Sequence, residues 1–163
     1  MLIIALLVLQ EALRYEPGHE LPDQGNLHLF ALNQPHEPYN SSPPTSGPHM
    51  PSLLPPDIYP EQVPDEMQVH NLEDGFVNVQ YDCPEGCLEL VTQLTELVNE
   101  YLAEGEGRVL MGPYEGITDP ETEQRHRIAL TAWTRLEVFD DFDAERIHSF
   151  IDAYRGLDHH VAQ

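Results

Sequence analysis

The sequence contains no lysine, so arginine supplies all seven of its basic residues. Aspartate and glutamate together number 29, and the formal net charge at pH 7 is −22. A chain this negative repels the phosphates of nucleic acids and the anionic surfaces of membranes. The composition therefore argues against nucleic acid as a partner and favours the binding of cations.

Long apolar runs are scarce as well. The most prominent, MLIIALLVL at residues 1–9, falls short of the roughly 20 residues that a membrane-spanning helix needs. It also lacks the basic residues and the cleavage site of a signal peptide. We expect residues 1–16 to insert into a neighbouring copy of the chain and build a homopolymer, an extracellular filament; a segment folded onto its own domain or the remnant of a membrane anchor are the alternatives. The side chains expected to make this contact are Leu2, Ile3, Ile4, Leu6, Leu7, Val8 and Leu9.

Cysteine occurs only twice, as Cys83 and Cys87 in the stretch YDCPEGC. Two cysteines four residues apart can form a local disulfide, bind a metal or carry out thiol redox chemistry. The stretch lies between an expected strand and an expected helix, which resembles the Sco-type copper chaperones of the thioredoxin superfamily; the proline that follows their second cysteine is Leu88 here. We favour a disulfide, because exported thiol pairs are readily oxidised, and keep a thioredoxin-like copper-transfer or redox element around Cys83 as the alternative.

Proline is unevenly distributed, since 12 of the 15 prolines lie in residues 17–66. Such a stretch disfavours helices and central strands, so we expect an extended segment that packs on the folded domain. An α+β domain should follow at residues 67–157, with a short tail at 158–163. The histidine pair in this tail is expected to be solvated.

Regular structure is predicted from the period of the apolar residues. The stretches GFVNVQY, GRVLMG, RIALTAW and RLEVF are typical of strands, and two stretches have helical spacing. The predicted order is strand, helix, three strands, helix, in a small mixed β-sheet. The strands are expected at 75–81, 107–112, 127–133 and 135–139, and the helices at 87–103 and from Asp143, a candidate N-cap, to Gly156.

Three short motifs carry a resemblance to a known family. They are PPTSGPH at 43–49, VHNLEDG at 69–75 and IALTAW at 128–133, and with them residues 17–156 resemble the prokaryotic domain of unknown function family 3105. The resemblance implies a location outside the cytoplasmic membrane, behind an N-terminal anchor, but no activity. The second motif of the family has a histidine where Asp74 stands in this chain.

Rigid loops that present a polar side chain are often functional sites, and the prolines of PPTSGPH restrict the backbone around His49. The family resemblance adds a histidine upstream of Tyr39, for which His28 is the expected counterpart and His36 the other choice. Imidazole is a good ligand for copper, zinc, iron and nickel.

We therefore expect a non-enzymatic, extracytoplasmic metal-binding protein, with copper favoured over zinc and with no nucleotide or organic cofactor. The alternative is that the histidines only hydrogen-bond the loops in which they lie. A carboxylate in place of the family's second histidine would favour harder cations or act as a partner of a ligand. The candidate ligands are His28, His49, His70, Glu73, Asp74 and Met50.

Overall fold

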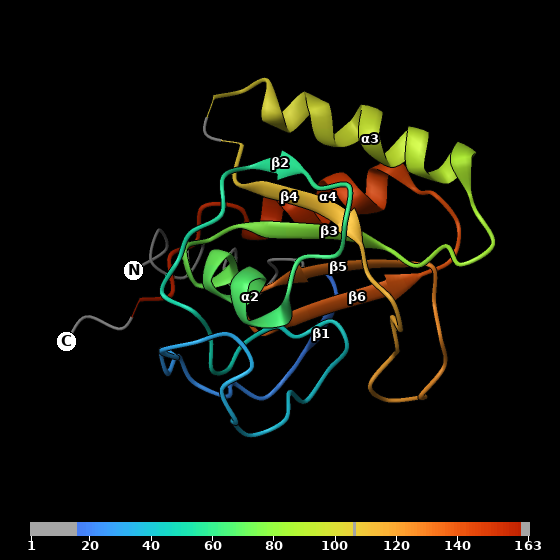
Figure 1. Ribbon diagram of the computed structural model, residues 1–163. Coiled ribbons are helices and arrows are strands. Elements are labelled where there is room, and N and C mark those ends of the chain that lie inside the picture. The colour runs from blue at the N-terminus through green and yellow to red at the C-terminus, as the bar shows by residue number, and fades with distance from the viewer. Residues whose placement is uncertain (1–15, 106, 161–163) are drawn as a thin grey trace, which may run out of the picture.

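The computed structural model of the protein describes residues 16–105 and 107–160. These residues form an α+β fold with one mixed six-stranded sheet and three helices (Figure 1). The α+β prediction is confirmed. The elements are β1 (His19–Glu20), β2 (Asp57–Ile58), α2 (Asp65–Glu73), β3 (Val77–Tyr81), α3 (Leu88–Leu102), β4 (Val109–Pro113), β5 (Ile128–Ala132), β6 (Arg135–Phe139) and α4 (Ala144–Tyr154).

The strands follow the order β1-β6-β5-β3-β4-β2 across the sheet. β3 and β4 are parallel, with Val79 opposite Met111, and the crossover between them is α3. β2 also runs parallel to β4, whereas β5 pairs antiparallel with β3 and β6, and β6 with β1. Parallel strands need such a crossover, and the tight antiparallel pair β5–β6 needs only the two residues between them.

Helices α3 and α4 pack on one face of the sheet. The apolar residues of β3, Val77 and Val79, point to this face and are fully buried. Asp143 caps α4 as the sequence predicts, because its side chain accepts a hydrogen bond from the backbone N–H of Arg146. The helical residues in this core are Leu90, Leu94, Leu97, Val98 and Tyr101 of α3 and Ile147, Phe150, Ile151 and Tyr154 of α4.

Helix α2 covers part of the opposite face of the sheet. Asn78 and Gln80, the residues of β3 that alternate with its valines, are buried beneath it. Both donate side-chain hydrogen bonds to Oε1 of Gln68, at 3.2 and 2.6 Å. These amide contacts fix α2 against the centre of the sheet.

The sequence prediction missed α2. Its residues are buried on several sides, including polar Gln68, Asn71 and Glu73, so its sequence lacks the apolar stripe that marks a helix lying on a core. The helix begins at Asp65, just before the predicted domain boundary at residue 67. The short strands β1 and β2 were also not predicted, because two residues are too few for an alternation to be visible.

The proline-rich segment crosses the face that carries α2 and runs along the edges of the sheet (Figure 1). All seven residues of PPTSGPH, 43–49, are buried, although they belong to no helix or strand. The backbone is tied to the domain by hydrogen bonds such as the one from the N–H of Thr134 to the carbonyl of Thr45, at 3.0 Å. The motif is therefore an internal loop.

Cys83 and Cys87 form a disulfide between the end of β3 and the start of α3, as predicted. The further likeness of this region to thioredoxin stays a prediction. The assembly segment and its aliphatic residues lie almost entirely outside the described residues, so the filament stays a prediction as well. In the described part of the chain, no helix is both long enough and apolar enough to span a membrane.

Candidate metal centre

The last turn of α2 presents two of the predicted ligands. His70 and Glu73 are three residues apart, which places their side chains on the same side of a helix. The helix ends at Glu73, and Gly75 follows in the left-handed conformation with φ +74°. Because the C-terminal end of a helix carries a partial negative charge, this position favours a cation.

PPTSGPH contributes the third predicted ligand from within its buried loop. The side chain of His49 is 0% exposed. Its Nδ1 lies 2.8 Å from the carbonyl oxygen of Gly47 in the same motif. Since a carbonyl can only accept, Nδ1 carries the proton, and the lone pair of a neutral imidazole is then at Nε2. The loop thus aims Nε2 of His49 at α2.

His28 reaches the same place from an adjoining extended segment. His28 and His49 form a parallel bridge, in which the N–H of His49 donates to the carbonyl of Leu27 at 3.0 Å and the N–H of Leu29 donates to the carbonyl of His49 at 2.7 Å. The side chain of His28 is 49% exposed, so it forms the outer wall of the site.

Four donor atoms converge, one each from His28, His49, His70 and Glu73, and all lie within 4.8 Å of one another. From Oε2 of Glu73 the distances are 3.1 Å to Nε2 of His49 and 3.9 Å to both Nε2 of His28 and Nδ1 of His70. Two donors that share an ion at about 2.1 Å each can lie at most about 4.2 Å apart. A shift of roughly half an ångström in the side chains, estimated from those metal–ligand lengths, therefore fits an ion.

The hydrogen bonding of His49 favours a cation between its ring and Glu73. Burial lowers the pKa of His49, although the hydrogen bond to Gly47 and the charge of Glu73 act in the opposite direction. A neutral His49 that donates from Nδ1 turns a lone pair toward Oε2 of Glu73, which is only 1% exposed. Two acceptors at 3.1 Å repel each other unless a positive charge lies between them.

His70, like His49, has one ring nitrogen beside an oxygen atom and the other facing the cluster. Its Nε2 lies 3.3 Å from Oδ2 of Asp74, whereas its Nδ1 faces the cluster and is buried without a hydrogen-bond partner among the described residues. Burial lowers the pKa of His70, against the opposing charge of Asp74. A histidine ligand held by a carboxylate on its other nitrogen is common at metal sites, because the carboxylate orients the ring. Asp74 thus lies where it would orient His70 as a ligand.

The three sequence motifs meet at this cluster. Trp133, from IALTAW, packs with Val69 and Leu72 of α2, and its ring lies edge-on to that of His49, with the centroids 6.3 Å apart. The second oxygen of Glu73 accepts a hydrogen bond of 2.6 Å from Nδ2 of Asn26. The motifs are distant in the sequence, yet they build one wall of the site.

The remaining candidates are His36 and Met50. His36 lies beside Glu66 and Tyr39, so His28 and not His36 joins the cluster. Met50 follows His49 and donates its backbone N–H to the carbonyl of Glu66; its sulfur stays a predicted ligand.

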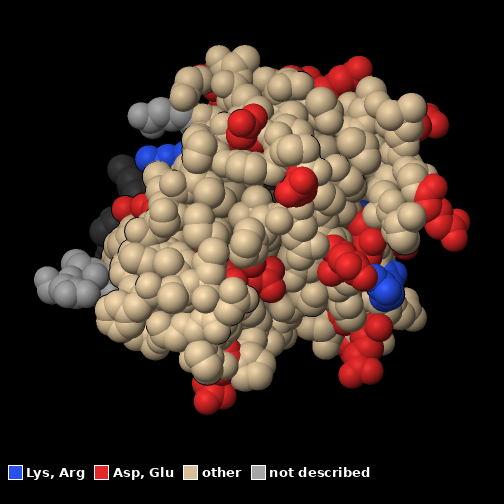
Figure 2. Space-filling view, in the orientation of Figure 1, with Lys and Arg blue, Asp and Glu red and all other residues tan. Residues whose placement is uncertain are grey.

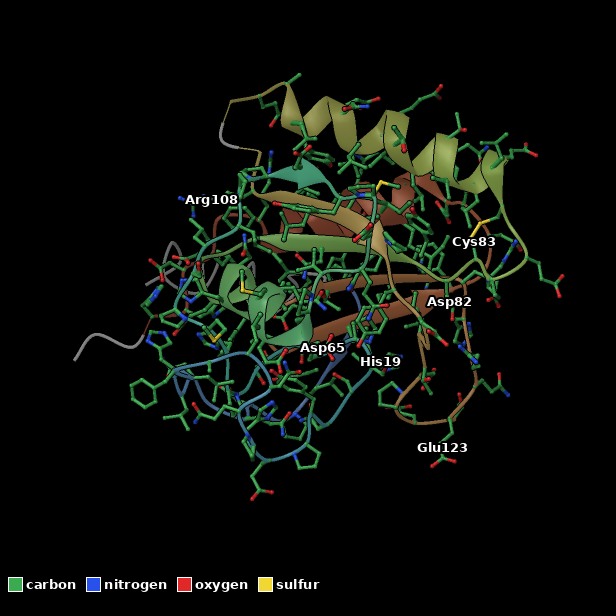
Figure 3. The ribbon with its side chains drawn as sticks, in the orientation of Figure 1. His19, Asp65, Asp82, Cys83, Arg108 and Glu123 are labelled. Carbon is green, nitrogen blue, oxygen red and sulfur yellow. A yellow bond between two sulfur atoms is a disulfide. The ribbon has the colours of Figure 1, made fainter. Side chains whose placement is uncertain are left out.

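The Cys83–Cys87 disulfide lies at the far end of the sheet. Arg108, which donates a hydrogen bond of 3.0 Å to the carbonyl of Asp74, marks the end of β3 nearest the histidines, and Cys83 lies beyond the opposite end (Figure 3). The two candidate sites therefore lie at opposite ends of β3 (Figure 3).

Sequence reasoning missed one histidine. Nε2 of His160 lies 3.6 Å from Oε2 of Glu73, although the tail was expected to be solvated. The doublet His159–His160 was the available signal, but no feature of the sequence indicates that the tail returns to α2.

Comparison with known proteins gives one match. The profile of a family described as "Protein of unknown function (DUF3105)" matches residues 33–162. Searches of curated proteins and of solved structures found no match. The matched region includes His49, His70 and Glu73 and covers more than half of the chain, which confirms the resemblance seen in the motifs. The chain belongs to the DUF3105 family of proteins of unknown function.

Proposed function

We propose that this protein binds a transition-metal ion outside the cytoplasmic membrane, through His28, His49, His70 and Glu73, and that copper is the preferred ion. The observation that carries the proposal is the convergence of four donor atoms around a buried carboxylate. Two of the three nitrogens are directed by partners on their other ring nitrogen, the carbonyl of Gly47 for His49 and Asp74 for His70.

The ligand types support a transition metal. Imidazole suits copper, zinc, iron and nickel, whereas calcium and magnesium prefer an environment of oxygen alone. Among divalent ions copper binds most tightly to a given set of nitrogen and oxygen ligands. A three-histidine, one-carboxylate set therefore favours copper over zinc on affinity.

The number of ligands supports binding rather than catalysis. Catalytic zinc sites typically use three protein ligands and leave one position for water or substrate. This cluster offers four protein donors, one more than those catalytic sites use. We therefore propose a non-enzymatic role, such as holding or delivering the ion.

The disulfide supports a location outside the cytoplasm, and the surface charge supports the binding of cations. Disulfides persist mainly in oxidising compartments, and the Cys83–Cys87 pair is closed. Figure 2 shows many acidic and few basic side chains on the face in view. Such a field attracts cations and raises their concentration near the protein. We also propose that the chain assembles into a filament through residues 1–16. This part of the proposal is supported only by the apolar sequence of that segment.

The proposed function is tested by metal analysis of the purified chain. We expect the apo protein, offered equimolar Cu²⁺ and Zn²⁺ and then dialysed, to retain about one ion per chain and chiefly copper, because the ligand set ranks the ions in that order. Mass spectrometry of the digested sample measures both metals. Retention of neither ion at micromolar protein would refute the proposal.

Paired substitutions separate the histidine site from the alternative, a Sco-like transfer or redox site at the cysteines. The double change Cys83→Ser and Cys87→Ser should leave the copper stoichiometry intact, because the disulfide lies at the other end of β3. It should lower the free energy of unfolding by about 2 kcal/mol, from the loop-closure entropy of a short loop. His49→Ala should abolish retention of copper while the disulfide stays closed. The reverse pattern would favour the cysteine site.

A further inference from the structure

The C-terminal segment returns to the metal site through a close backbone contact. The N–H of Gly156, just after α4, donates to the carbonyl of Gly75 at 2.7 Å. A Cβ atom at Gly75 would lie 2.7 Å from the carbonyl oxygen and 2.8 Å from the nitrogen of Leu157. Only glycine permits this approach, so the end of α2 is shaped to receive the segment.

Two further contacts hold the segment over the cluster. The N–H of His159 donates to the backbone carbonyl of Glu73 at 2.9 Å, and its ring stacks on Trp133 with the centroids 6.1 Å apart. The segment is thereby fixed to the last residue of α2 and to the aromatic wall beside His49. Residues 157–160, called the strap below, are positioned by these contacts.

The strap presents His160 to the site with one nitrogen already engaged. Its Nδ1 lies 2.7 Å from Oδ1 of Asp158, which leaves Nε2 free to act as a donor atom toward a metal. Nε2 lies 3.6 Å from Oε2 of Glu73, closer than the corresponding atoms of His28 and His70 at 3.9 Å. The ring of His160 is 6.4 Å from that of His70. Asp158 therefore holds His160 as Asp74 holds His70, through the ring nitrogen that does not face the cluster.

We infer that the strap closes the metal site and that His160 is a fifth, exchangeable ligand which controls uptake and release of the ion; the inference rests on the proposed function. The inner part of the site, His49 and Glu73, is buried and fixed. The outer part, His28 and His160, is 49% and 45% exposed. An ion therefore enters and leaves on the side that these two histidines share.

The contrast between fixed inner ligands and an exchangeable outer ligand has a physical reason. The fixed ligands lie in a buried loop and on a helix, so they move only with the core. In the strap it is His159 that holds the chain to α2 and Trp133, whereas the side chain of His160 is held by Asp158 of the strap itself, so His160 can leave the ion without moving the core. A ligand that can leave alone lowers the barrier to transfer of the ion, because an acceptor can take its place before the other bonds break.

The substitution His160→Ala tests the inference, with His148→Ala as the matched control. His148 is also a half-exposed histidine, 38% exposed, but it bonds to Tyr101 at the α3–α4 interface. Each protein is loaded with one equivalent of Cu²⁺, and transfer of copper to an excess of a chelator is followed by absorbance. His160→Ala should release copper roughly 10- to 100-fold faster, the range over which supporting groups change metal affinity, and His148→Ala should match the unaltered protein.

Electron paramagnetic resonance of the copper-loaded proteins counts the nitrogen ligands. This number would not change if His160 only stabilised the fold. The nitrogen couplings should correspond to one nitrogen fewer in His160→Ala, and added imidazole should restore them. If the unaltered protein binds copper and His160→Ala has the same release rate and spectrum, the inference is wrong and the four-ligand site stands. If the unaltered protein binds no copper, the proposed function fails and the inference with it.

Discussion

Glu73→Gln should weaken the binding of copper by at least about 100-fold, beyond the effect expected for a supporting residue, and should leave the metal-free protein equally or more stable. The carboxylate is the single charged ligand and lies buried among three imidazoles. When His49 is neutral with its proton on Nδ1, its lone pair faces Oε2 of Glu73, whereas the amide of a glutamine can donate to that nitrogen. The opposite effects on affinity and on stability identify a metal ligand.

Thermal or chemical unfolding with and without copper measures both effects. At a copper concentration 100 times the dissociation constant of the unaltered protein, binding adds about 2.7 kcal/mol to its stability. For a variant that binds 100-fold more weakly, the same concentration adds only about 0.4 kcal/mol. Glu66→Gln is the control, because Glu66 is also shielded but lies beside His36, outside the cluster. A Glu73→Gln protein stabilised by copper as much as the control would contradict the site.

Gly75→Ala should destabilise the protein by at least about 2 kcal/mol and speed the release of copper. A left-handed backbone costs a residue with a side chain about 1–2 kcal/mol, and Gly75 has φ +74°. The new Cβ would also clash with backbone atoms of Leu157, so the strap must move. The loss of stability and the faster release of copper are thus both expected from the same added methyl group.

Gly105→Ala separates the strain from the clash. Gly105 also has a positive φ, +86°, but a Cβ there would meet nothing within 4 Å among the residues that the structure describes. Its substitution should cost about 1 kcal/mol, from the backbone strain alone, and leave the release of copper unchanged. Chemical denaturation measures the first quantity and the chelator assay the second. Equal costs at both positions would show that the strap does not need the close approach at Gly75.

The central elements of the fold could be predicted because each has a local cause. The alternation of Val77 and Val79 with polar residues, the helical spacing in 88–102 and the N-cap at Asp143 are properties of neighbouring residues, and the structure has a strand and two helices there. Helix α2 was not predicted because other parts of the chain bury it on several sides, so its own residues show no apolar stripe. The amides of β3 and the proline-rich segment surround it, and neither contact is visible in its own nine residues.

The sequence by itself determined which residue types are available as candidate ligands and where the disulfide forms. The excess of acidic residues and the rigid loop around His49 favour a cation site, and the two cysteines favour a local disulfide. These features depend on residue type and on short-range geometry.

Only the tertiary structure decided which donor atoms share one centre. In the structure His28 and not His36 lies in the cluster, and Asp74 lies beside His70. His160, which is distant in the sequence, lies beside Glu73. The physical reason is that a metal site is a set of distances between side chains, and long-range packing sets those distances. Here the backbone contacts at Gly75 and at the His28–His49 bridge set them, between residues separated by 20 to more than 80 positions.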